Sequence, residues 1–231
     1  MDILYEDNSI IVVCKPYGVP SQADETGDKD MLTMVKQYIA QKYNKPGNVY
    51  IGLVHRLDRP TGGVMVFARN SKSAARLADQ IKNGEFNKTY LAVTNGVPAS
   101  SNGTLINYLK KDEKQNKVSI APRAEEGAKR AELSYNVLAK KDNLALLKIS
   151  LKTGRSHQIR VQLANIKCPI VGDQKYGNQT QKVPLNLFAT SIRLIHPVTK
   201  QSMVFRAYPP EDSEAWNKFN LETYLGLVAS E

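Results

Sequence analysis

Residues 54–69 read VHRLDRPTGGVMVFAR, a charged segment that runs directly into an apolar one. Pro60 disfavours a helix at this point, and the two glycines that follow allow the backbone to turn tightly. The apolar run Val64–Ala68 is too short for a typical helix and is rich in β-branched residues, so it predicts a buried strand. A charged loop that leads into a core strand can hold reactive groups rigidly.

The charged segment also has a plainer interpretation. Arg56 or Arg59 could form an ion pair with Asp58 that serves only the structure of a turn, because structural ion pairs perturb carboxylates as catalytic ones do. The segment taken alone does not choose between a catalytic aspartate and a structural one.

Composition limits the class of protein. The 231 residues suit one large domain, and the formal net charge of +10 favours a polyanionic partner such as nucleic acid, although an ordinary basic surface would give the same excess. Cys14 and Cys168 lie far apart beside apolar residues, which is typical of reduced core cysteines. With no apolar signal region or membrane-length apolar run, we expect a cytoplasmic protein without a membrane segment.

The pattern of apolar residues predicts the secondary structure. We expect strands at Ile3–Tyr5, Ile10–Lys15, Val64–Ala68, Thr89–Val93, Ala131–Leu138, Leu144–Leu151, Leu185–Ile195 and Ser202–Ala207. We expect helices at Met31–Tyr43, between an N-cap at Ser71 and Gly84, after Gly154, and at Ser213–Leu227. The polar segment Asn107–Arg130 predicts a solvated hairpin at a sheet edge. Hairpins dominate without a βαβ rhythm, so the fold class is α+β, a largely antiparallel mixed β-sheet with flanking helices and loops.

Three parts of the sequence carry open alternatives. Lys15 either faces a phosphate or is solvated. Tyr90 is either a platform on which a base stacks or an ordinary tyrosine of a half-buried strand. Arg155 and Arg160 are five positions apart and need not share a helix face, so one could reach a site while the other reaches solvent or phosphate; alternatively the segment is a basic amphipathic helix with a structural His157.

Several familiar chemistries are absent from the sequence. It contains no phosphate-binding G-x-x-x-x-G-K-[ST] loop, no G-x-S-x-G nucleophile elbow and no zinc-deaminase signature, and its histidines and cysteines lack metal-ligand spacing. What remains is Asp58 among arginines. An ionised carboxylate beside a guanidinium keeps a low pKa and can act as nucleophile or base without a metal.

Three ordered motifs resemble the RluA-type family of RNA pseudouridine synthases. They are H-R-L-D at His55–Asp58, K-x-Y-x-A at Lys88–Ala92 and G-R-x-H-Q-I-R at Gly154–Arg160, supported by Lys15-Pro16 and His196-Pro197. The resemblance covers nearly the whole chain. It implies a single pseudouridine synthase catalytic domain over residues 1–231, without the S4 module of many relatives, so that the choice of RNA would rest with this domain.

The resemblance implies isomerisation of a uridine in tRNA or rRNA by base flipping, with no cofactor and no metal. Asp58 would be the catalytic aspartate, attacking the ribose C1′ or removing a C2′ proton. Arg160 would keep Asp58 ionised through a salt bridge, and Tyr90 would stack on the uracil. Arg56 would enter the RNA stack in place of the flipped base. We assign Arg56, together with His55 and Arg155, to substrate binding.

The chain departs from the family pattern at two positions. Gly62 stands where the family usually has the serine of T-S-G, and Phe188 stands where it often has a histidine. Neither change touches Asp58. We expect a monomer that binds RNA. Two other functions stay open: an RNA-binding or RNA-folding protein on the same scaffold with little catalysis, and an enzyme acting on a phosphorylated small molecule.

Overall fold

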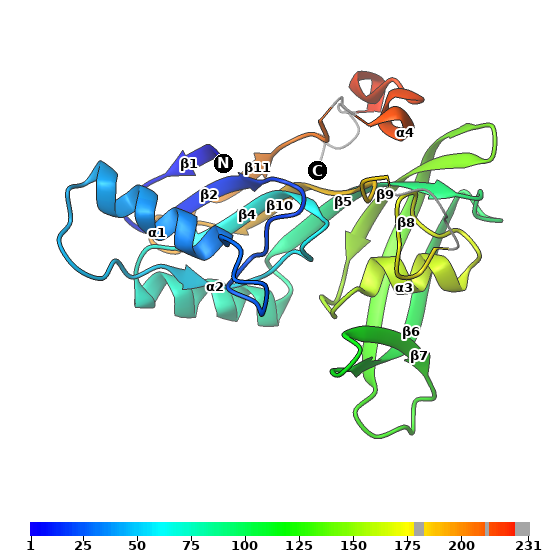
Figure 1. The fold of residues 1–231 in the computed structure, drawn as a ribbon, viewed down its shortest axis with the longest axis horizontal. Coiled ribbons are helices and arrows are strands. Elements are labelled where there is room, and N and C mark those ends of the chain that lie inside the picture. The colour runs from blue at the N-terminus through cyan, green and yellow to red at the C-terminus, as the bar shows by residue number, and fades with distance from the viewer. Residues whose placement is uncertain (178–182, 211–212, 225–231) are drawn as a thin grey trace. The chain divides into compact units, whose positions relative to one another are not determined.

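The computed structural model describes residues 1–177, 183–210 and 213–224. The chain divides into two compact units. The first unit comprises Met1–Lys88 and Ala189–Tyr208, and the second comprises Thr89–Phe188 and Pro209–Glu231. Figure 1 shows the elements of both units.

The first unit is a sheet with two helices. Its strands follow the order β1-β2-β4-β10, with β11 paired to β10 and β3 paired to β4. The elements are β1 (Asp2–Glu6), β2 (Ile10–Lys15), α1 (Met31–Lys42), β3 (Gly52–Leu53), β4 (Gly62–Ala68), α2 (Ser71–Asn83), most of β10 (Leu187–Ile195) and β11 (Ser202–Arg206).

Strand β4 is the centre of this unit. All of its residues are buried, and because successive side chains of a strand point to opposite faces, both faces of β4 are covered. On one face Val64 and Val66 pack with Leu77 of α2. Burial of each such side chain contributes about 1.5 to 3 kcal/mol, so the run that predicted a strand also anchors the loop before it.

Both helices of the first unit begin at polar caps. Asp30 caps α1 by accepting the backbone N–H of Thr33. Asn70, not Ser71, caps α2, because its side chain accepts the N–H of Ser73. The N-cap assignment to Ser71 was therefore wrong by one residue. Gly84 ends α2 in the left-handed conformation at φ 77°, as its sequence predicts.

The second unit has the strand order β5-β9-β8-β6-β7. Its elements are β5 (Asn87–Asn95), whose first two residues belong to the first unit, β6 (Asn102–Asp112), β7 (Lys117–Ala121), β8 (Lys129–Lys141), β9 (Leu144–Leu151), α3 (Gln158–Asn165) and α4 (Glu214–Asn217). The pairings β5–β9, β9–β8, β8–β6 and β6–β7 are all antiparallel. The expected α+β class is confirmed, and the polar segment forms the edge hairpin β6–β7.

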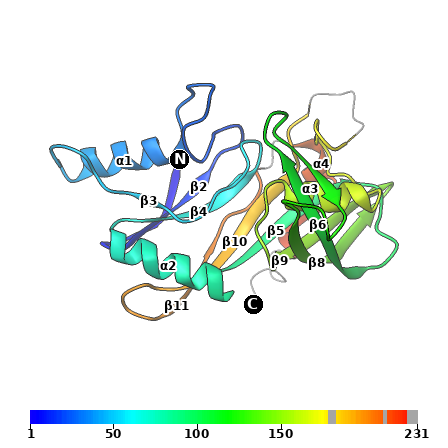
Figure 2. The ribbon, with the colours of Figure 1, turned by 90° about the horizontal axis from the view of Figure 1, so that it is seen from below.

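Helix α3 packs on that hairpin, as Figure 2 shows. Val161 of α3 lies in one cluster with Leu109 of β6, Val118 of β7 and Ala131 of β8. The helix begins at Gln158, later than a start directly after Gly154, because His157 before it has a left-handed backbone at φ 51°. This packing fixes the residues of α3 against the sheet.

The expected helix Ser213–Leu227 was wrong in its length. Helix α4 covers only Glu214–Asn217, and the chain leaves the helix at Lys218 before a short helical turn at 221–224. Residues 225–227 lie outside the described part of the chain.

We predict that Gly63→Ala destabilises the protein severely. Gly63 has φ +123°, and an added Cβ would lie 2.2 Å from the carbonyl oxygen of Ala189 in β10, where backbone must move. We expect a loss of about 3 kcal/mol or more in the free energy of unfolding, measured with urea. The control is Gly47→Ala, which has φ +88° but open space around its Cβ and should lose only about 1 to 2 kcal/mol. Equal losses would contradict the steric argument.

Candidate active site

The loop before β4 presents Asp58. The Asp58 side chain is half-buried and Arg56 is exposed, whereas Leu57 between them is buried. Behind the aspartate the N–H of Thr61 donates to the carbonyl of Asp58 at 2.9 Å and closes a turn. The buried Leu57 therefore separates two side chains that point out of the core.

Ser21 is hydrogen-bonded to the backbone of this loop. Its buried hydroxyl donates to the carbonyl of Leu57 at 2.7 Å and accepts the N–H of Leu57 at 3.1 Å. Both backbone groups of the residue next to Asp58 are thus satisfied by one side chain, which removes the freedom of the loop to shift.

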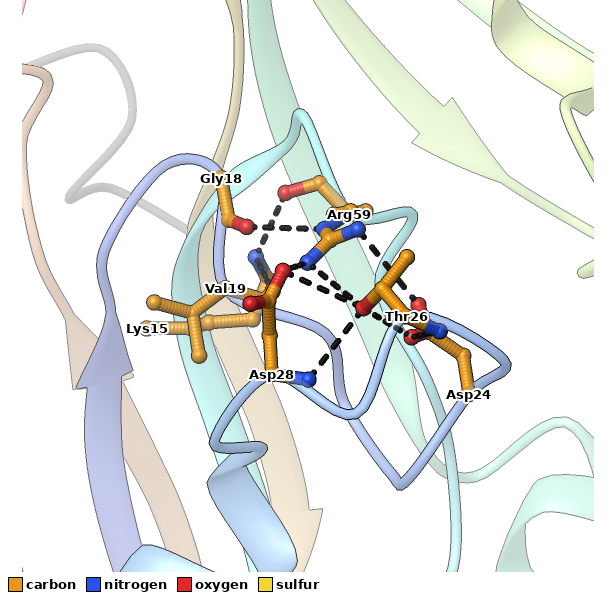
Figure 3. A network of polar contacts seen from close by, with 7 residues as sticks. All are labelled: Lys15, Gly18, Val19, Asp24, Thr26, Asp28 and Arg59. Atoms are coloured by element: carbon orange, nitrogen blue, oxygen red, sulfur yellow. Dashed lines mark hydrogen bonds and ion pairs between the residues drawn. The ribbon is translucent and has the colours of Figure 1, made fainter.

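Lys15 at the end of β2 is buried completely, with no exposed surface. Its ammonium donates to the carbonyl of Val19 at 2.6 Å and to those of Pro16 and Arg59 at 3.0 Å, as Figure 3 shows in part. Both expectations for this residue, phosphate contact and solvation, were wrong. Lys15 instead ties the loop that follows β2 to the residue after Asp58.

The environment of Lys15 also disfavours its charge. Burial lowers the pKa of Lys15 to about 7, and the nearby Asp58 carboxylate offsets part of that shift while the Arg59 charge adds to it.

Arg59 connects the same loop to the segment before α1. Its Nε donates to the carbonyl of Gly18 at 3.0 Å, and its Nη2 bonds the carboxylate of Asp28 and the hydroxyl of Thr26 (Figure 3). A longer ion pair reaches Asp24 at 3.8 Å. The simple turn in which Arg59 pairs with Asp58 is therefore not formed, because Arg59 pairs with acids of the neighbouring loop.

His55 is a packed residue of the first unit. Its Nε2 accepts the N–H of Val66 at 3.0 Å, and its ring lies 5.2 Å from that of Phe86. Its Nδ1 is buried without a hydrogen-bond partner among the described residues. Burial, with a smaller effect of the Lys88 charge, lowers the pKa of His55 to about 3, so the ring is neutral at pH 7. Its contact with substrate stays a prediction.

The second unit carries the remaining predicted residues. Tyr90 lies on β5 opposite Ile149 and is only 5% exposed. Arg155 is exposed, and its Nε donates to the carbonyl of Arg130 at 3.0 Å. Arg160 on α3 is only 5% exposed. The two arginines thus differ as their spacing allowed, one at the surface and one inside.

Arg160 is held by a carboxylate that the sequence pattern did not reveal. Its Nε and Nη2 donate to the two oxygens of Asp173, both at 2.8 Å. Burial alone would raise the pKa of Asp173, but the hydrogen bond and charge of Arg160 lower it below its usual value. The predicted pairing of Arg160 with Asp58 stays a prediction.

Sequence reasoning missed the roles of Ser21, Lys15 and Asp173. Lys15 directly follows an apolar run, which could have suggested a buried amine. Asp173 lies in PIVGDQKYG, which we interpreted only as an irregular loop. No group of histidine, cysteine or acidic residues in the described residues could hold a metal ion, and no described helix is long and apolar enough to cross a membrane.

A family model described as RNA pseudouridylate synthase matches residues 9–165, which span both the Asp58 loop and Arg160. The chain belongs to this family. Its members are isomerases that act on RNA, so RNA is the substrate of this pseudouridine synthase chain, and the resemblance found in its motifs is confirmed.

Curated relatives and solved structures agree with the family. The chain is 32% identical to the uncharacterized RNA pseudouridine synthase YhcT of Bacillus subtilis, over 92% of this chain and 70% of that protein. It is 30% identical to tRNA pseudouridine synthase C of Vibrio cholerae, over 90% of each. The fold is similar to human RNA pseudouridylate synthase domain containing 4, with a TM-score of 0.76 and 24% identity over 91% of this chain and 89% of that chain.

We predict that Lys15→Met weakens the pseudouridine synthase fold at the Asp58 loop. The substitution leaves the carbonyls of Pro16, Val19 and Arg59 without their shared donor, which should lower the free energy of unfolding by about 2 kcal/mol or more. Urea unfolding measures this loss, with Lys72→Met on the exposed face of α2 as control. An unchanged urea midpoint in Lys15→Met would contradict the stabilising role of these three hydrogen bonds.

We predict that His55 makes the protein acid-sensitive. Because the pKa of His55 is about 3 when folded and near 6.5 when unfolded, the unfolded chain binds the extra proton, and this contribution to stability falls as pH drops from 6.5 toward 3. In His55→Gln, whose amide does not titrate, the fall should be shallower. Urea unfolding at pH 7, 6, 5 and 4 gives both slopes, and identical slopes would contradict the prediction.

Proposed function

We propose that this pseudouridine synthase converts a uridine of a tRNA or rRNA to pseudouridine, with Asp58 as its catalytic carboxylate. The observation that carries the proposal is the clamped loop: a half-buried aspartate in the family motif H-R-L-D, fixed from behind by Ser21, Lys15 and Arg59. Relatives support the substrate class, since one is named a tRNA pseudouridine synthase and another a ribosomal large subunit pseudouridine synthase.

The reaction needs a carboxylate and no external reagent. The N1–C1′ bond of uridine breaks, the uracil turns and a C5–C1′ bond forms. The proton on C5 is then lost to solvent and N1 takes up a proton, so that the product is an isomer of the substrate. Asp58 either attacks C1′ and is later displaced, or removes a C2′ proton that is later returned. Both routes require Asp58 in its ionised form at the start.

Arg160 would keep Asp58 ionised through an ion pair between the two side chains. Lys15 lies close enough for its charge to interact with Asp58 whenever its amine is protonated. A guanidinium has five N–H groups, and the bond to Asp173 uses one on Nε and one on Nη2. The N–H groups of Nη1 therefore point away from Asp173 and suit a further carboxylate.

The other assigned residues would handle the RNA. Arg56 is exposed next to Asp58, as a side chain that replaces a flipped base must be. Exposed Arg155 would contact phosphate, and Tyr90 would stack on the uracil in the site. His55 would contribute to substrate binding from the start of the H-R-L-D segment, where its ring accepts the N–H of Val66. The single catalytic domain, the monomer and the cytoplasmic location stay predictions.

We predict that Asp58→Asn abolishes turnover while RNA binding persists. The amide cannot act as nucleophile or base, so tritium release from RNA labelled at uracil C5 should fall at least about a thousandfold. The substrate is total RNA from cells that lack the protein. Asp79→Asn, at an exposed position of α2, is the matched control and should keep full activity.

Binding and mapping complete this test. Asp58→Asn should bind the RNA within about threefold of wild type, and the new pseudouridines would identify the RNA. Turnover by the Asp58→Asn protein, with deamidation excluded by mass spectrometry, would refute the role of Asp58. Tight RNA binding without tritium release by wild type would favour the RNA-binding alternative.

A further inference from the structure

The guanidinium of Arg160 is enclosed by more than its bond to Asp173. The ring of Tyr176 lies with its centroid 5.1 Å from Cζ of Arg160. This distance is within the range of a cation–π contact, which attracts the cation to the ring. The guanidinium of Arg160 is therefore bonded to Asp173 along one edge and is also in contact with the ring of Tyr176.

Asp173 is itself rigid. It is fully buried, and its Oδ1 accepts the N–H groups of Lys175 and Tyr176 at 3.0 and 3.1 Å as well as Nη2 of Arg160. The same carboxylate thus orders both the arginine and the turn that carries Tyr176. A buried charge with this many partners has little freedom to rotate.

Tyr176 is fixed at its other end by two groups. Its hydroxyl oxygen accepts the N–H of Val118 in β7 at 2.8 Å and lies 2.6 Å from Nδ1 of His157. The oxygen can accept from Val118 and still form a hydrogen bond with Nδ1 of His157, whose direction depends on the tautomer of the ring. The two rings meet edge to face at 5.6 Å.

His157 reaches this position at a conformational cost. It has φ 51°, a left-handed conformation that is unfavourable for a non-glycine residue, and as the N-cap of α3 it makes no side-chain capping bond. Helix capping therefore does not explain the histidine of G-R-x-H-Q-I-R, whereas its bond to Tyr176 does. The interpretation of His157 as a structural residue agrees with this geometry and gains a specific partner.

We propose that Tyr176 and His157 are positioning residues that orient the Arg160 guanidinium for pseudouridine formation. Two hydrogen bonds to Asp173 fix one edge of the Arg160 guanidinium. The plane of the guanidinium can still tilt relative to the plane of the carboxylate. The Tyr176 ring opposes that tilt, and His157 with Val118 fixes the ring. The inference rests on the proposed role of Arg160 in catalysis.

The experiment compares single-turnover rates at saturating RNA. Tyr176→Leu removes the ring and should slow the rate about 30-fold, whereas Tyr176→Phe keeps the ring, loses the hydroxyl and should slow it about 5-fold. RNA affinity should stay within about twofold for both. The control is Tyr135→Phe, a buried tyrosine of β8 in the same unit, which should match wild type.

A merely structural role predicts a different result. It would lower the melting temperature and the folded fraction but leave the rate per folded molecule unchanged. A wild-type single-turnover rate in Tyr176→Leu, alongside inactive Arg160→Leu, would overturn the positioning role. Full activity in Arg160→Leu would instead refute the proposed catalytic role of Arg160.

A second readout does not depend on activity. The Nε–H signal of Arg160 in a ¹H–¹⁵N spectrum, assigned by its loss in Arg160→Lys, should be sharp and slow to exchange in wild type. It should broaden in Tyr176→Leu and persist in Tyr135→Phe. An unchanged signal in Tyr176→Leu would overturn the proposal even if the wild-type protein made no pseudouridine.

Discussion

The buried amine of Lys15 is the constraint on which the first unit depends. Taking a charged amine out of water costs several kcal/mol, which is why the pKa of Lys15 falls to about 7, and the three carbonyls that accept its N–H groups offset part of that cost. Those carbonyls belong to the segment after β2 and to the residue after Asp58. The hydrogen bonds that offset the cost of burial therefore also fix the loop that carries Asp58, the proposed catalytic residue.

Arg59 and Arg160 are each paired with acids of their own unit. Arg59 pairs with Asp24 and Asp28, and Arg160 pairs with Asp173. Arg59 is partly exposed, so its pairs contribute little free energy but define the loop conformation. Arg160 is buried, and without Asp173 its charge would be uncompensated. The motif arginines thus differ in role because their burial differs, which their order in the sequence does not reveal.

Local patterns predicted the fold well where one interaction type dominates. The β-branched run before Arg69 became β4, and Gly84 ended α2, because apolar burial and left-handed backbone leave clear traces in the sequence. The charged hairpin was also predictable. The N-cap of α2 was missed by one residue because Asn70 and Ser71 are both good caps, and only the backbone geometry decides between them.

The site was less predictable because its partners are distant in sequence. Asp58 and Arg160 stood out through motifs, but Lys15 meets the carbonyl of Arg59 across 44 positions, and Asp173 meets Arg160 across 13. Carbonyl acceptors carry no signal in a sequence, since every residue has one. Likewise, α3 begins only after His157, whose backbone is left-handed and whose side chain forms a hydrogen bond with Tyr176, and the sequence pattern reveals neither feature.

Two departures from local preference lie beside side chains proposed for catalysis. A lysine in the core and a histidine at positive φ are both unfavourable locally, and each is retained with hydrogen bonds to groups that hold a proposed catalytic side chain. Because these supports form when the protein folds, the Asp58 loop and the Arg160 side chain are ordered before RNA arrives. On the roles proposed for these two side chains, catalysis would require little rearrangement of charged groups in the protein, which is the condition under which fixed charges stabilise a transition state most effectively.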